Sequence, residues 1–271
     1  MQFSAGAVTL LLTACWLLPG QSSTGHASAT HGIKSNTPAD PKPDPPAVSA
    51  HAAPGTEKLT FDVEWRLVHA GTVSIDQEKT HAEMRLQSAG LVSSLFKVND
   101  TYTVDYDEPF CASRGLMDSE EGKRHRESEI TYDRVRNRAS YLERDVLKGI
   151  VLHADQVDIP NCVHEVIGAF LQLRAHPIEP GQSTQVPMSD GRRFAAVRID
   201  AQEREDIKTP AGNFKAVRYE AHMLNSVIYT RKGQVFVWLG DDPHHLPVQI
   251  RLRMQFPIGT VTLQLLKEEH S

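Results

Sequence analysis

The chain has 271 residues and a formal net charge of −5, from 29 basic and 34 acidic side chains. This mild acidity gives no signal for nucleic-acid binding, and no block of like charge suggests docking to a membrane surface. Behind an N-terminal leader and linker, residues 57–271 are enough for a single domain with a substantial core.

Residues 1–29 have the layout of a secretory signal peptide. Residues 5–18 are almost continuously apolar, Pro19-Gly20 interrupts them, and Ala27-Ser28-Ala29 matches an A-x-A cleavage site. The apolar run is shorter than the roughly 20 residues that a membrane-spanning helix needs. The sequence therefore predicts export, with the mature protein periplasmic or secreted.

A lipid anchor is the alternative. Leu12-Thr13-Ala14-Cys15 resembles a bacterial lipobox, in which Cys15 would carry the lipid and become the mature N-terminus. Against this, Trp16-Leu17-Leu18 continue the apolar run beyond the cysteine, which favours Cys15 as a small apolar residue inside a signal core.

Residues 30–56 predict a disordered linker. They are rich in Pro, Ala, Ser and His, and residues 38–46 contain five prolines. Repeated proline removes backbone donors and favours extended polyproline conformations, so neither helix nor sheet is expected.

The two cysteines that remain after signal removal, Cys111 and Cys162, favour a disulfide, because an even number in an exported chain is typical of one. It would tie a strand near Cys111 to the start of the main helix and stabilise the domain by roughly 4 kcal/mol. Two buried free thiols are the alternative. A catalytic cysteine is disfavoured, because no nucleophile signature surrounds either residue.

Most of the domain predicts antiparallel strands. Leu59, Phe61, Val63, Trp65 and Leu67 alternate with polar residues, as in a half-buried strand, and Ala70-Gly71 marks a turn or bulge. Thr209-Pro210-Ala211-Gly212 is a turn signal between two strands. Further strands are expected within 73–75, 82–86, 102–106, 110–117, 126–132, 139–142, 183–188, 194–199, 214–222, 235–239, 246–256 and 260–266, with one or two helical turns at 91–96.

One segment predicts the main helix. Behind Pro160, with Asn161 as a plausible cap, apolar residues from Val163 to Leu173 recur at helical spacing until His176-Pro177 stops them. The sequence thus predicts more than ten strands and one main helix, and so many strands must hide the unpaired edges of their sheet. The expected fold is therefore mainly β: an antiparallel, strongly curved sheet or barrel-like wrap, with the helix across one mouth.

Several segments together resemble the bacterial DUF3108 family, a family of unknown function. They are residues 57–65, 70–73, 94–102, 130–133, 208–218 around the Thr-Pro-Ala-Gly turn, and 238–248 from Trp238 onward. The resemblance covers nearly all of 57–269 in order. It implies a β-rich periplasmic or envelope domain without an assigned activity, and it supplies no catalytic residues. The cysteine pair is not attributed to the family as a whole.

Candidate sites are few. Asp241-Asp242-Pro243-His244-His245 has metal-ligand chemistry, but consecutive turn residues point apart, so a polar turn is favoured and no metal or other cofactor is predicted. His164-Glu165 lacks the second histidine of an HExxH motif.

The predicted function is non-enzymatic binding of a hydrophobic ligand or lipid. Phe61, Trp65, Tyr102, Tyr106 and Trp238 are the candidate lining of an apolar cavity of several hundred Å3, with ordinary core as the alternative for each. A protein-interaction scaffold of the envelope, with an exposed apolar patch and no cavity, is the second hypothesis. A hydrolase, which would need His244 and His245 beside a distant carboxylate, is the third.

Overall fold

The computed structural model describes residues 56–107, 109–256 and 258–270. The expected signal peptide, Cys15 and all of the expected linker except Thr56 lie outside these residues. Within the described part of the chain, no helix is both long enough and apolar enough to cross a bilayer.

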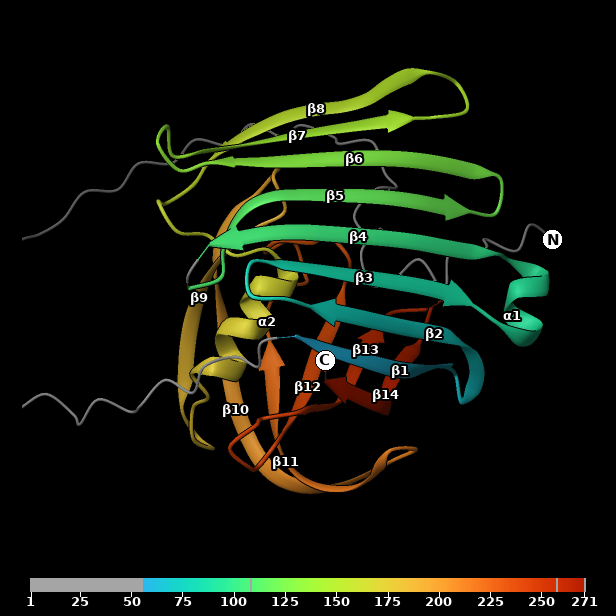
Figure 1. Ribbon diagram of the computed structural model, residues 1–271, viewed down its shortest axis with the longest axis vertical. Helices are drawn as coiled ribbons and strands as arrows, with labels where there is room; N and C mark the ends of the chain where they lie inside the picture. Colours follow the sequence, from blue (N-terminus) through green and yellow to red (C-terminus); the bar gives the residue numbers. More distant parts are fainter. Residues whose placement is uncertain (1–55, 108, 257, 271) are drawn as a thin grey trace, which may run out of the picture.

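One sheet of 14 antiparallel strands makes up the domain (Figure 1). Its order is β8-β7-β6-β5-β4-β3-β2-β1-β14-β13-β12-β11-β10-β9, so two meanders are joined where the first and last strands pair. The strands are β1 (Glu57–Trp65), β2 (Val68–Gln77), β3 (His81–Ser88), β4 (Val98–Asp107), β5 (Cys111–Glu121), β6 (Arg124–Asp133), β7 (Arg138–Asp145), β8 (Ile150–Asp158), β9 (Ser183–Ser189), β10 (Phe194–Thr209), β11 (Gly212–Ala221), β12 (Gly233–Gly240), β13 (Pro247–Met254) and β14 (Thr260–His270).

The sequence patterns explain most of these elements. Burial alternates along β1, with Leu59, Phe61 and Val63 on the core face. The predicted irregularity at Ala70-Gly71 is a bulge, because Val63 pairs with Gly71 while Glu64 pairs with His69. The predicted turn at Pro210-Ala211 joins β10 to β11, whose Thr209 and Gly212 face each other. The expected curved, mainly β fold is therefore confirmed.

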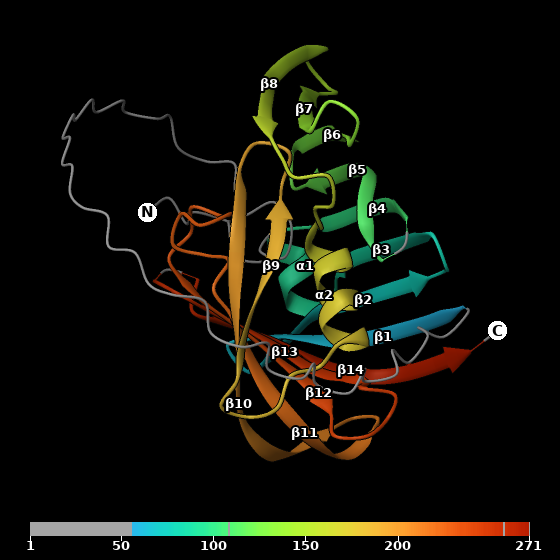
Figure 2. The ribbon, with the colours of Figure 1, turned by 90° about the vertical axis from the view of Figure 1, so that its left-hand side faces the viewer.

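The main helix differs from its prediction in start and setting. Helix α2 (Val166–Ala175) begins after Glu165, whose side chain accepts hydrogen bonds from the backbone N–H groups of Ile167 and Gly168. Asn161 is not the cap. Figure 2 shows α2 between the two halves of the curved sheet, and none of its residues is exposed. The helix therefore occupies the concave interior instead of only covering a mouth. The other helix, α1 (Gly90–Leu95), is the short one expected after β3.

Connector 159–165, between β8 and α2, bridges the opening that the unclosed sheet leaves. The backbone N–H of Ala112 in β5 donates to Val163 O (2.8 Å). On the other side, His164 N donates to Pro187 O (2.8 Å) and Ser189 N donates to His164 O (3.0 Å), both in β9. One short segment thus links the two meanders by backbone hydrogen bonds.

Candidate ligand-binding site

An apolar cavity of about 140 Å3 lies against α2 in the interior of the sheet. Of the side chains that line it, only Gln77 and Tyr229 carry a polar group. The others are Leu59, Val73, Ile75, Met84, Val166, Ile167, Ala169, Phe170, Leu171, Leu173, Met188, Ile199, Ala221, Met223, Leu224, Val235, Val237, Ile250, Leu252 and Leu263.

This volume is smaller than the several hundred Å3 that the sequence led us to expect. An apolar cavity of about 150 Å3 stays free of water and accepts benzene, so this one matches an apolar group of roughly six carbons. A void of this size is nevertheless unusual, because native interiors contain few voids larger than a water molecule.

Polar contacts hold α2 beside the cavity at its C-terminal end. Arg174, in the last turn, forms a buried ion pair with Glu57 of β1, in which Nη2 donates to Oε1 over 2.8 Å and Nη1 donates to Oε2. Arg174 Nε also donates to the backbone oxygen of His244 (3.1 Å). The cavity therefore has a firmly anchored helical wall.

A smaller and more polar cavity, of about 40 Å3, lies near the other end of α2. It is lined by Tyr102, Met117, Ser128, Ile130, Tyr132, Tyr141, Glu165, Val166, Ser189, Asp190 and Tyr229. The two cavities share Val166 and Tyr229 as lining residues.

Two carboxyl groups of this polar cavity have raised pKa values. Burial raises the pKa of Glu165 from 4.5 to about 7, even though the N–H groups of Ile167 and Gly168 and a hydrogen bond with Tyr102 favour its ionised form. Burial also raises the pKa of Asp190, whose Oδ1 accepts from the backbone N–H groups of Arg192 and Arg193. Because desolvation outweighs these hydrogen bonds, Glu165 is only partly ionised near neutral pH.

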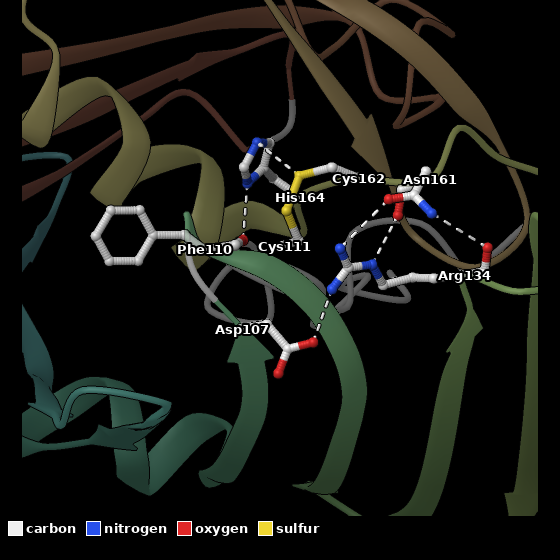
Figure 3. The surroundings of a disulfide bond; sticks show 7 residues. All are labelled: Asp107, Phe110, Cys111, Arg134, Asn161, Cys162 and His164. Atoms are coloured by element: carbon white, nitrogen blue, oxygen red, sulfur yellow. Dashed lines mark hydrogen bonds and ion pairs between the residues drawn. A yellow bond between two sulfur atoms is a disulfide. The ribbon is translucent and has the colours of Figure 1, made fainter.

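A disulfide joins Cys111, the first residue of β5, to Cys162 in the connector, with the Cα atoms 5.1 Å apart (Figure 3). The predicted pairing is confirmed. Beside it, His164 Nδ1 lies 2.8 Å from the backbone oxygen of Phe110, so Nδ1 carries the proton and donates. Burial lowers the pKa of His164.

Arg134 holds the other side of the connector. Its Nε donates to Asn161 O over 2.9 Å, and its Nη1 donates to Asp107 Oδ2 over 2.7 Å. The disulfide, the His164 hydrogen bond and the Arg134 contacts thus together hold the connector that leads into α2.

A family model described as "Protein of unknown function (DUF3108)" matches residues 60–266. The chain belongs to the DUF3108 family. The matched stretch contains every lining residue of the two cavities except Leu59, together with α2 and both cysteines of the disulfide. Among curated proteins, none matches this DUF3108 chain.

The fold of this DUF3108 domain resembles that of a solved structure with low sequence identity. A β-barrel-like DUF1849 protein from Brucella abortus is 7% identical, with a TM-score of 0.53, over 80% of this chain and 98% of the other. A DUF1089 protein from Pseudomonas aeruginosa is 14% identical, with a TM-score of 0.37, over 68% of this chain and 90% of the other. The first likeness supports a barrel-like curvature and says nothing about function; the second is too weak to carry an argument.

The five aromatic residues predicted as ligand-binding are all well packed, but none lines the apolar cavity of the DUF3108 domain. Tyr102 lines the polar cavity, and Phe61 is fully buried in the core. Trp65 Nε1 donates to Ile258 O over 2.7 Å. The hydroxyl of Tyr106 is 2.7 Å from Glu78 O and 3.1 Å from His81 O. Any role of these residues in ligand binding stays a prediction.

The position of Trp238 follows from the two-residue period of β12. Its neighbours Val235 and Val237 line the apolar cavity, so Trp238 faces the opposite side of the sheet. There its Nε1 donates to Glu205 Oε2 over 3.0 Å, and the guanidinium of Arg251 lies 5.1 Å from its ring centroid. The guanidinium of Arg251 therefore covers the ring of Trp238 on the convex face of the sheet.

The residues at 241–245 form a polar turn. Asp242 Oδ1 accepts from His244 N over 2.7 Å, and Asp241 Oδ2 accepts from Arg204 Nε over 2.9 Å. His245 Nδ1 contacts the backbone oxygen of Gly240 at 3.2 Å. The side chains of Asp241, Asp242 and His245 thus contact three separate groups, so the hydrolase hypothesis gains no support from this turn.

Another group of possible metal ligands lies at the β1–β14 pair, where atoms of Glu57, Glu268 and His270 approach within 4.8 Å of one another. Glu57 is already paired with Arg174 through both carboxylate oxygens, and His270 Nε2 lies 3.0 Å from Glu268 Oε1. All three possible ligands are therefore already engaged in ion pairs.

Sequence reasoning did not select Glu165 or the apolar face of α2 as parts of a binding site. A lone acidic residue directly before an apolar helix was the available signal, because carboxylates favour the N-terminal end of a helix.

Proposed function

We propose that this domain is a non-enzymatic binding protein of the cell envelope that takes up a hydrophobic small molecule or part of a lipid in the cavity beside α2. The observation that carries the proposal is an interior void of about 140 Å3 with an almost entirely apolar wall. A water molecule in such a cavity would lose its hydrogen bonds and gain none from the wall, so the favoured occupant is apolar.

The envelope location rests on two observations. The leader at residues 1–29 has a signal-peptide layout, and a disulfide is typical of oxidising compartments such as the periplasm. A lipid anchor at Cys15 is the alternative to a free periplasmic or secreted protein.

Lipid extraction tests the proposal. The domain with its linker, residues 30–271, is purified from a bacterial periplasm without detergent and extracted, and the extract is analysed by mass spectrometry against a control protein treated identically. A selective, stoichiometric apolar molecule is the expected result. An empty protein that also fails to bind added hydrophobic probes would refute the proposal.

A matched pair of substitutions assigns the binding to the cavity. Ala169 lines the cavity from α2, whereas Ala196 is exposed on β10. Ala169→Leu adds three carbons inside the void and should abolish retention of the ligand. Ala196→Leu adds the same atoms to the surface and should leave retention unchanged. Equal retention by both variants would place the ligand elsewhere.

An envelope scaffold is the second candidate, and exposed apolar residues favour it. Leu67 and Phe256 are 92% and 90% exposed, and Leu91 and Leu95 of α1 are 68% and 75% exposed. The turns that carry Leu67 and Phe256 adjoin, because Arg66 N donates to Thr260 O over 3.1 Å. Replacing these four residues by serine should then reduce cross-linking to envelope proteins and leave ligand retention intact; unchanged cross-linking would count against the scaffold.

A further inference from the structure

The two interior cavities together have the layout of a site for an amphiphile. They share the side chains of Val166 and Tyr229, so they adjoin at the start of α2. One has an apolar wall and the space of a short alkyl group, whereas the other is bordered by carboxyl and hydroxyl groups. The volume of the polar cavity, about 40 Å3, corresponds to roughly two or three water-sized volumes, which suits a small polar head.

The polar cavity presents several hydrogen-bond acceptors. The Tyr132 hydroxyl already donates to Ser189 O over 3.0 Å, and the Tyr102 hydroxyl is hydrogen bonded to Glu165. A phenolic oxygen whose proton is engaged in this way presents only its lone pairs to a neighbour, as an ionised carboxylate does. A head that donates therefore finds acceptors in these two phenolic oxygens and in the carboxyl groups of Glu165 and Asp190.

The charges disfavour an anionic head. Among the residues that the structure describes, no lysine, arginine or histidine lines either cavity. Arg192 and Arg193 stabilise the ionised form of Asp190 from outside the lining, and Arg192 Nε is paired with Asp155 at 2.8 Å. No cation offsets the burial of Glu165. A ligand carboxylate would be desolvated beside two acidic groups and would meet no positive partner.

Building on the proposed function, we infer that the ligand is an amphiphile with a hydrogen-bond-donating head that carries no negative charge, namely an alcohol or an amine. The alkyl chain occupies the apolar cavity, and the head lies in the polar cavity beside Glu165 and Asp190. The same geometry selects against fatty acids. Glu165 thus combines two tasks, since the carboxylate that begins α2 also faces the head.

Three six-carbon probes with different heads test this inference: 1-hexanol, hexylamine and hexanoate. Their six carbons match the apolar cavity. Binding to residues 30–271 is followed at pH 8 by chemical-shift titration, with observation of the cavity methyl groups. The alcohol and the amine should bind at least tenfold more tightly than hexanoate. Tighter binding of hexanoate would overturn the inference.

Charge-removing variants locate the selectivity. Glu165→Gln should weaken hexylamine binding and strengthen hexanoate binding, each by at least threefold, with 1-hexanol least affected. Asp100→Asn is the matched control, because Asp100 is also a buried carboxyl but lines neither cavity. If Glu165→Gln does not fold, Asp190→Asn changes the charge of the same cavity, and the same directions are expected.

The outcomes separate this inference from the function on which it rests. If all three probes bind equally, or if the control shifts affinities as much as Glu165→Gln, the head-group assignment is wrong and hydrophobic binding stands. If none of the probes shifts the cavity methyl groups, both are wrong.

Discussion

Removal of the disulfide should destabilise the domain substantially without changing its fold. The variant replaces both Cys111 and Cys162 with alanine. The bond closes a loop between residues 51 positions apart, and loop-closure entropy at that length gives a stabilisation of about 4 kcal/mol. At about 2 to 4 °C per kcal/mol for a domain of this size, the melting temperature should fall by about 8 to 16 °C.

The native state should survive because other contacts hold the connector. The hydrogen bonds of Ala112 to Val163 and of His164 to Pro187 do not involve the disulfide, nor does the contact of Arg134 with Asn161. The effect should therefore arise chiefly in the unfolded chain, which becomes less restricted.

Equilibrium urea unfolding, followed by circular dichroism with and without a reducing agent, measures the loss. Reduction should bring the natural protein to the midpoint of the double variant and should leave the variant itself unchanged. A loss below about 1 kcal/mol would refute the loop-closure reasoning. A large loss with a much smaller denaturant slope would instead show that the native state had loosened.

Three further predictions concern buried groups. Because burial raises the pKa of Glu165 from 4.5 to about 7, the folded state binds a proton that the unfolded chain releases, and stability should fall by up to about 3 kcal/mol as the pH rises from below 4.5 to above 7. Urea titrations across that range should show a flatter profile for Glu165→Gln, and an equal slope in both proteins would contradict the assignment. Glu57→Gln leaves the buried Arg174 without its ion-pair partner and should cost about 3 to 5 kcal/mol in chemical unfolding, whereas a cost below about 1 kcal/mol would mean that water replaces the carboxylate. Gly71→Ala would place a Cβ 2.1 Å from a backbone oxygen of β3 and should lower thermal stability by about 1 to 3 kcal/mol, and an unchanged melting temperature would show that the bulge adjusts freely.

Local sequence patterns were sufficient to predict most strands, but they failed for a strand whose pairing depends on the rest of the sheet. The alternation along Leu59 to Trp65 predicted β1, and the Pro210 turn predicted the β10–β11 hairpin, because both depend on short-range geometry. By contrast, the strand β8 (Ile150–Asp158) was missed. It is an edge strand without a fully buried residue, so its sequence carries no strong core pattern.

An apolar cavity was expected from the sequence, and the structure contains one with a different lining. The search for large aromatics selected Trp238 and Phe61, whereas the wall of the apolar cavity is mostly aliphatic and includes α2. Alternation shows which side chains share a face, but it does not show which face is concave or where facing side chains leave space. These depend on the curvature of the whole sheet and on the helix within it.

The sequence by itself determined the family, through the resemblance of its motifs to DUF3108. It also determined the antiparallel β class and the partners of the disulfide, because these follow from local periodicity, turn chemistry and the number of cysteines. Only the tertiary structure decided that β1 pairs with β14, that α2 is enclosed, and that Glu165 lies at a polar cavity beside an apolar one. The physical reason is that the pairing of the first and last strands, the burial of a helix and the volume of a void all depend on residues far apart in the sequence.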